Sequence, residues 1–206
     1  MKPGRTFLRR LIDLSTSVAN LDTKIHVTDH AFEDIRWWRE FIGDWNGREI
    51  IPTRTLDTAK MGLYTDASSL GMGGVLGSKW FMTSWPPQCL LKHINVLELF
   101  AVFTAIRIWG SDWRDLDVVI YTDNKPITQI WLTGSSQNKD IMVILRHIFF
   151  FLAKNNINVH LEHLYGYNNK LADCLSRLQV EEYRKITKNA GDMTLIPDHV
   201  WGLFPE

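Results

Sequence analysis

Two short apolar stretches with the same ending constrain the fold of this chain more than any other feature. Residues 63–66 (Leu-Tyr-Thr-Asp) closely match residues 120–123 (Ile-Tyr-Thr-Asp), and in each stretch β-favouring residues end in a carboxylate. We interpret them as buried strands that pair in parallel. Such a pair places Asp66 and Asp123 at one edge of a sheet, where ligands of open α/β sheets bind.

The pattern around these strands predicts the order βββαβααβα, which fits one mixed sheet of about five strands with helices on both faces. The expected strands are 61–66, the two halves of a hairpin over 71–85 that turns near 77–78, 117–123 and 157–165. The expected helices of this part are 94–110, 126–134, 140–154 and 168–179, the last capped by Asn168 or Asn169. The fold class is therefore α/β.

Amphipathic helices are expected before this sheet, over residues 5–17 and from a Thr28 cap to Asn46–Gly47. Residues 51–59 have no clear period and are interpreted as a linker. We predict a helical segment at 1–56, the α/β domain at 57–180 and a tail at 181–206. The tail lacks periodicity, and its Trp201 and Phe204 are candidates to dock on the core.

Composition sets limits but does not indicate a function. With 206 residues, of which 45% are apolar, the chain can bury one sizeable core, and a formal net charge of +0 means that any basic face is local. Cys89 and Cys174 lack metal-ligand spacing and are expected to be buried free thiols in a reducing compartment. No membrane span or signal peptide is expected, which favours an intracellular protein, with a transit peptide at the Arg-rich start as the alternative.

Four acids are candidates for a site: Asp66, Glu98, Asp123 and Asp173. Each also has a structural explanation, as a turn, a solvated helix position or a helix cap. Glu98, however, shares a helical stripe with apolar residues, and a buried acid needs a cation. Acids from neighbouring strands and from the helices that cover them make an oxygen-rich cluster suited to Mg²⁺.

The order and spacing of these acids resemble the ribonuclease H domain of retroelement reverse transcriptases. The closing stretch is similar to the gypsy-like form, and residues 7–14 and 32–47 resemble the region between polymerase and ribonuclease H in DIRS-like retrotransposons. The residues that carry the resemblance are Thr65-Asp66-Ala67-Ser68 with Gly71 and Gly73, Asn95-Val96-Leu97-Glu98-Leu99, Tyr121-Thr122-Asp123-Asn124 and residues 163–177 from His163 to Arg177.

This resemblance implies an endonuclease that cuts the RNA strand of RNA–DNA hybrids, in which the four acids hold two Mg²⁺ ions, with Mn²⁺ able to replace them. It implies that His163, ten residues before Asp173, assists proton transfer or product release. It also implies a connection- or thumb-like role for residues 1–56 and a polymerase domain of a parent protein as partner. The substrate-binding residues that it implies are Gly71, Gly73, Asn95 and Asn124.

Two other functions stay open. One is a catalytically silent ribonuclease H-like module that serves structure or hybrid binding, and the other is an ordinary α/β domain whose acids are caps. The chain has no Tyr-x-Asp-Asp polymerase motif. Residues 134–139 leave no room for the extra basic helix that grips the hybrid in some relatives, so phosphate contacts are expected instead from arginines of the first helices. These are Arg5, Arg9, Arg10, Arg36 and Arg39.

Overall fold

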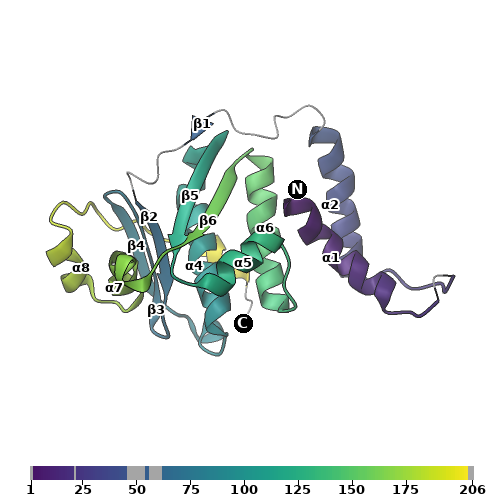
Figure 1. The fold of residues 1–206 in the computed structure, drawn as a ribbon, viewed down its shortest axis with the longest axis horizontal. Helices are drawn as coiled ribbons and strands as arrows, with labels where there is room; N and C mark the ends of the chain where they lie inside the picture. The colour runs from purple at the N-terminus through teal and green to yellow at the C-terminus, as the bar shows by residue number, and fades with distance from the viewer. Residues whose placement is uncertain (1, 21, 46–53, 56–61, 204–206) are drawn as a thin grey trace.

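The computed structural model of the protein describes residues 2–20, 22–45, 54–55 and 62–203 (Figure 1). Its strands are β1 (Arg54–Thr55), β2 (Leu63–Ala67), β3 (Gly71–Leu76), β4 (Lys79–Ser84), β5 (Leu116–Thr122) and β6 (Asn158–His163). Its α-helices are α1 (Lys2–Thr16), α2 (Asp29–Trp45), α4 (Ile94–Trp109), α5 (Lys125–Thr133), α6 (Lys139–Lys154), α7 (Lys170–Ser176) and α8 (Val180–Ile186). Short 3₁₀ helices are η1 (Pro87–Cys89), η2 (Gly110–Trp113), η3 (Gly166–Asn168) and η4 (Asp198–Leu203).

The sheet has the strand order β6-β5-β2-β3-β4 (Figure 1). Strands β2, β3 and β4 are antiparallel, and Gly77 supplies the positive φ of 60° that the turn between β3 and β4 requires. Strand β5 is parallel to both β2 and β6. This order and these directions confirm the expected ribonuclease H-like fold. Within the predicted linker, β1 adds a short sixth strand that pairs with the start of β5.

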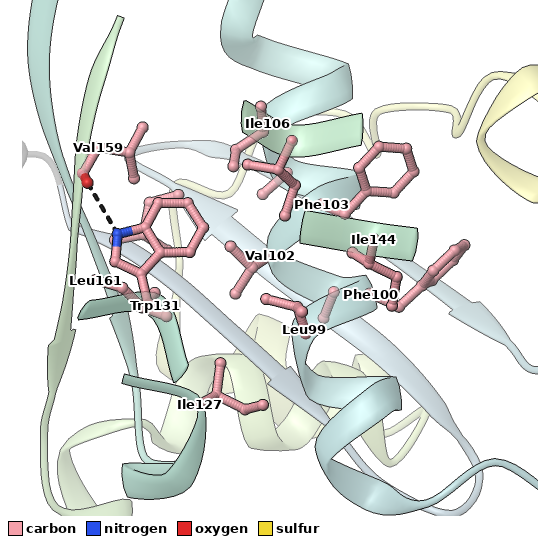
Figure 2. Close-up of a cluster of buried hydrophobic side chains, with 14 of the residues drawn as sticks. Leu99, Phe100, Val102, Phe103, Ile106, Ile127, Trp131, Ile144, Val159 and Leu161 are labelled. Atoms are coloured by element: carbon pink, nitrogen blue, oxygen red, sulfur yellow. Dashed lines mark hydrogen bonds between the residues drawn. The ribbon is translucent and has the colours of Figure 1, made fainter. Parts of the chain in front are cut away.

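Helices cover both faces of the sheet. Neighbouring residues of β3 point to opposite faces, so each face carries apolar side chains that need a cover. Leu76 belongs to the main core beneath α4, α5 and α6, part of which Figure 2 shows, and Val75 belongs to a smaller core with Leu175 of α7. The indole Nε1 of Trp131 donates to the carbonyl oxygen of Val159 at 3.0 Å (Figure 2), which fastens α5 to the edge strand β6. This bond thereby holds the segment between β5 and α5 in place.

The helices α1 and α2 lie beside α6 rather than on the sheet (Figure 1). The contact contains a buried carboxylate, Asp34, which accepts hydrogen bonds from Arg146 Nε of α6 at 3.3 Å and from Arg10 of α1 at 3.2 Å. Burial raises the pKa of Asp34, while the charges of both arginines act to lower it. The ion pairs therefore fix how the three helices meet.

Aromatic packing completes the contact between α1 and α2. The ring of Trp37 stacks on Phe7 of α1 with centroids 3.8 Å apart, and on Phe41 at 4.7 Å. Thr28 caps α2 as predicted, because its Oγ1 accepts from the Ala31 N–H at 3.2 Å. The predicted helix end at residues 46–47 lies outside the described residues.

The tail contains more structure than its sequence indicates. Tyr183 of α8 is fully buried in the smaller core, and the Trp80 indole donates to the Gly191 carbonyl oxygen at 2.7 Å. The predicted docking of Trp201 is observed, since its ring centroid lies 5.6 Å from that of Phe100. Phe204 lies outside the described residues.

One apolar stretch of the described residues, Ile94–Trp113, is long and apolar enough to cross a membrane by length and composition. No membrane span is expected from the sequence, although this one stretch reaches the length and composition of a span. Most of the stretch is buried inside the protein, where α4 forms the centre of the main core. Cys89 and Cys174 are both buried free thiols, as expected.

Candidate active site

Three carboxylates converge at one edge of the sheet. Asp66 is the penultimate residue of β2, and Asp123 directly follows β5, which is parallel to β2 with Tyr64 opposite Tyr121. Glu98 comes from α4, which packs on β2. One carboxylate oxygen from each acid lies within 4.8 Å of the others. The structure therefore brings together three of the four predicted acids.

Burial and mutual repulsion disfavour negative charge in this three-acid cluster. The pKa of Asp66 is raised to about 7, mainly by burial and with a contribution from the charges of Asp123 and Asp173. The pKa of Glu98 is raised well above its usual value, first by burial and then by the charges of Asp66 and Asp123. Without a cation, the cluster therefore holds protons near neutral pH.

The donor set fits a divalent metal ion. All three side chains offer oxygen, which Mg²⁺ and Mn²⁺ prefer. The Oε2 atom of Glu98 is buried and has no hydrogen-bond partner among the described residues, and a buried polar atom of this kind needs a partner. A cation would supply that partner and offset the repulsion between the acids.

Asp173 lies outside the three-acid cluster. It is in the first turn of α7, where its Oδ1 accepts a hydrogen bond from Arg177 Nε at 2.7 Å. Its charge nevertheless contributes to the raised pKa of Asp66, so the two carboxylates are near enough to interact. Asp173 therefore stands at the margin of the site, with a cation of the protein already paired to it.

Sequence reasoning missed the role of Asn169. The residue occupies the N-cap position of α7, but its side chain makes no capping hydrogen bond. Its Nδ2 instead donates to the carbonyl oxygen of Thr65 at 3.1 Å and lies 3.5 Å from an oxygen of each of Asp66 and Asp123. Asn169 is 1% exposed, so this amide bridges the two strand-end acids from within the protein. The sequence feature that could have indicated this role is its position four residues before the predicted site residue Asp173.

Two predicted substrate-binding residues lie together beside the acids. Asn124 Nδ2 donates to Asn95 Oδ1 at 3.2 Å, and Asn124 Oδ1 accepts from the Ile127 N–H to cap α5. A hydrogen bond from Asn124 also acts to lower the pKa of Glu98. Both amides are partly buried at the edge of the cluster, and their contact with a substrate stays a prediction.

The two predicted substrate-binding glycines have a packing explanation. A Cβ on Gly73 would lie 2.3 Å from the Leu175 Cβ, and one on Gly71 would lie 2.2 Å from the Thr83 carbonyl oxygen. Gly73 therefore allows α7 to lie directly on β3. Both glycines are buried, and their approach to a substrate stays a prediction.

His163 ends β6, opposite Thr122 of β5 and therefore next to the strand end that delivers Asp123. Its side chain is exposed, and its ring lies edge-on to Tyr165 with centroids 5.9 Å apart. Its role as an acid–base group stays a prediction.

No family model and no curated protein matches the chain. Among solved structures, the chain is similar to an RNase H1 from the halophilic archaeon Halobacterium salinarum, with 16% identity over 58% of this chain and 96% of that one, and a TM-score of 0.44. It is also similar to the protease–reverse transcriptase of prototype foamy virus, with 13% identity over 76% of this chain and a TM-score of 0.33. The chain covers 21% of that viral protein.

Proposed function

We propose that the protein is a Mg²⁺-dependent endonuclease that cuts the RNA strand of RNA–DNA hybrids and belongs to a retroelement reverse transcriptase. The observation that carries the proposal is the convergence of Asp66, Glu98 and Asp123, with a buried oxygen on Glu98 that has no hydrogen-bond partner in the described part of the chain. The ribonuclease H-like order of the strands and the resemblance of residues 163–177 support it. A polymerase domain of the parent protein is the proposed partner.

The residues of the chain have separate roles in this proposal. Asp66, Glu98 and Asp123 hold the metal ions, Asp173 completes the set from α7, and Asn169 keeps the two strand-end acids in place. When bound, the two ions would make the attacking water more acidic and stabilise charge on the leaving 3′ oxygen. His163, exposed at the end of β6, would transfer a proton or assist product release. Asn95 and Asn124 would contact the substrate.

A cleavage assay tests the proposal. The full chain is incubated with RNA–DNA hybrid, with duplex RNA and with duplex DNA, each labelled, in Mg²⁺ or in chelator. Of the three substrates, we expect only the RNA strand of the hybrid to be cleaved, and only when Mg²⁺ is present. Asp66→Asn should abolish cleavage, while Asp192→Asn, which changes an exposed acid, should not.

One observation favours the silent module as a second candidate. The carboxylate of Asp173 is already paired with Arg177 at 2.7 Å and lies outside the three-acid cluster. A silent module would bind the hybrid and leave it intact in both Mg²⁺ and Mn²⁺. That result, obtained with folded protein, would reject the nuclease.

A further inference from the structure

Three aromatic side chains follow one another where β6 leaves the sheet, and we call His163, Tyr165 and Tyr167 the aromatic ladder. The rings of Tyr165 and Tyr167 are stacked, with centroids 5.8 Å apart and planes 4° apart. His163 meets Tyr165 edge-on. Tyr165 is 67% exposed and Tyr167 is 78% exposed, so the stack presents large ring surfaces to solvent. A single exposed ring is ordinary, but a stacked and exposed pair beside a polar site is a candidate for binding.

The ladder is fixed to the three-acid cluster at both ends. Before Tyr165, the Leu164 N–H donates to the Thr122 carbonyl oxygen at 3.0 Å, one residue ahead of Asp123. After Tyr167, the buried Asn169 is anchored to Thr65 and to the acids, as described above. The ladder therefore cannot move far without disturbing the acids, and it is preorganised with respect to them.

The turn between the two tyrosines also touches the cluster. A Cβ built on Gly166 would lie 3.1 Å from Asp123 Oδ2, which shows how closely the backbone of η3 approaches this carboxylate. The Asn168 N–H donates to the Tyr165 carbonyl oxygen at 2.8 Å and closes the turn. The backbone that carries both exposed rings therefore lies against Asp123, so a nucleic-acid strand bound at the acids lies beside this segment.

We infer that Tyr165 and Tyr167 form a stacking platform for an unpaired nucleobase of the substrate, at the point where the hybrid duplex continues as a single strand. Every base has a π-face that stacks on aromatic side chains, but inside a duplex this face is covered by the neighbouring base pairs. The centroid distance of the two tyrosines is that of rings in direct contact, so the base adds to the outside of the stack. This inference rests on the proposed function, because the nucleic-acid strand that lies beside the rings is the one that the acids bind.

The test compares a blunt RNA–DNA hybrid with the same hybrid carrying a single-stranded RNA extension. Binding of the full chain is followed by fluorescence anisotropy in Ca²⁺, and 2-aminopurine at successive extension positions reports stacking by loss of its fluorescence. We expect the extension to increase affinity by about 5- to 150-fold, the range for one stacked base. One 2-aminopurine position should be quenched most strongly.

Matched variants identify the rings as the cause. Tyr165→Phe/Tyr167→Phe keeps both ring faces and should retain the effect of the extension and the quenching. Tyr165→Leu/Tyr167→Leu should lose both effects and keep the affinity for the blunt hybrid, and thermal melting should show that this exposed double substitution leaves the fold intact. Equal loss of affinity for blunt and extended hybrids would overturn the inference, because the rings would then contact the duplex. An extension that adds no affinity to the unmodified chain would overturn it as well, and would leave the rings available to a protein partner.

The same samples separate this inference from the proposed function. Cleavage of the blunt hybrid in Mg²⁺ tests the nuclease without involving the platform. Quenching of 2-aminopurine in the Asp66→Asn variant tests the platform without involving catalysis. An uncut blunt hybrid together with a retained extension effect would reject the nuclease alone. A cut blunt hybrid without an extension effect would reject the platform alone.

Discussion

Replacing Asp66 with Asn should stabilise the metal-free protein while it abolishes cleavage. Asp66 is buried, the charges of Asp123 and Asp173 act on it, and its pKa is raised from 3.8 to about 7. One pKa unit corresponds to about 1.36 kcal/mol, so ionising this carboxyl at pH 8 costs about 4 kcal/mol of folding free energy. This is an upper value, because the repulsion between the acids belongs to all of them and is not removed in full by changing Asp66 alone. Asn is uncharged and nearly the same size, so Asp66→Asn removes most of the cost.

The pH dependence has a definite sign. Because the pKa of Asp66 is higher in the folded chain than in the unfolded chain, the folded chain binds more protons between pH 3.8 and about 7. The contribution of Asp66 to stability is therefore fully present below pH 3.8 and is lost as the pH rises through about 7. The advantage of Asp66→Asn should be greatest at pH 8 and should shrink towards pH 4.5.

Thermal melting in chelator and in Mg²⁺ measures this effect. For a chain of this size, 1 kcal/mol shifts Tm by about 2–4 °C, so Asp66→Asn should raise Tm in chelator at pH 8 by on the order of 10 °C. Mg²⁺ should raise Tm of the unmodified chain and have much less effect on the variant. Asp192→Asn, an exposed acid, should change neither value. A lower Tm of Asp66→Asn in chelator at pH 8, or an advantage that is the same at pH 5, would refute the reasoning.

Three other substitutions follow from the site. His163→Ala should lower turnover by about 100-fold without changing the Mg²⁺-dependent rise in Tm, because His163 is exposed at the end of β6; an unchanged rate would make it structural. Asn169→Leu removes the donor between Asp66 and Asp123 and should weaken Mg²⁺ binding measured by the Tm rise, whereas Asn168→Leu, at an exposed neighbour, should not; equal effects would remove Asn169 from its positioning role. Gly73→Ala places a Cβ 2.3 Å from Leu175, so it should destabilise the fold by about 2 kcal/mol or more and reduce cleavage through displacement of α7, which denaturant unfolding and the cleavage assay would measure; full stability would show that α7 adjusts freely.

The parts of the site that the sequence predicts are those governed by periodicity. Asp66 and Asp123 lie at the ends of runs of β-favouring residues, and parallel pairing of such strands brings these ends to one edge of the sheet. Glu98 is predictable for a similar reason, since its helical stripe is apolar and the helix therefore turns it inward. For these three acids, the local sequence pattern indicates where each side chain points, and these orientations bring the acids together.

Asn169 shows why other parts are missed. Asn before a helix is normally interpreted as an N-cap, because its side chain can accept from the first turn. Here that amide bonds to Thr65, which is 104 residues earlier in the chain, and only the packing of α7 on β2 makes this contact available. The stacked pair of Tyr165 and Tyr167 is missed for the same reason, since its orientation depends on the 3₁₀ turn between β6 and α7.

The arginines of the first two helices have different roles, which the sequence alone does not distinguish. Arg10 Nη1 donates to the His30 carbonyl oxygen at 2.9 Å, to Glu33 at 3.1 Å and to the buried Asp34 at 3.2 Å. Arg10 therefore holds α1 on α2. Because its guanidinium is engaged in this way, we expect phosphate contacts from the exposed arginines instead. Arg5 is exposed and next to Thr6, whose hydroxyl donates to the Gly134 carbonyl oxygen at 2.6 Å.

Arg5 therefore lies beside the loop that follows α5. Arg36 and Arg39 are also exposed, on α2. Replacing Arg5, Arg36 and Arg39 together with Ser should therefore flatten the salt dependence of hybrid binding, by a slope of about 1 for each phosphate that an arginine no longer neutralises, and should leave Tm nearly unchanged. Replacing Arg10 with Met should lower Tm, because Asp34 loses a cation, and should leave the salt slope as it is. Anisotropy in Ca²⁺ over a range of salt concentrations measures both slopes, and a flatter slope for Arg10→Met than for the triple variant would show that this assignment of the arginines is reversed.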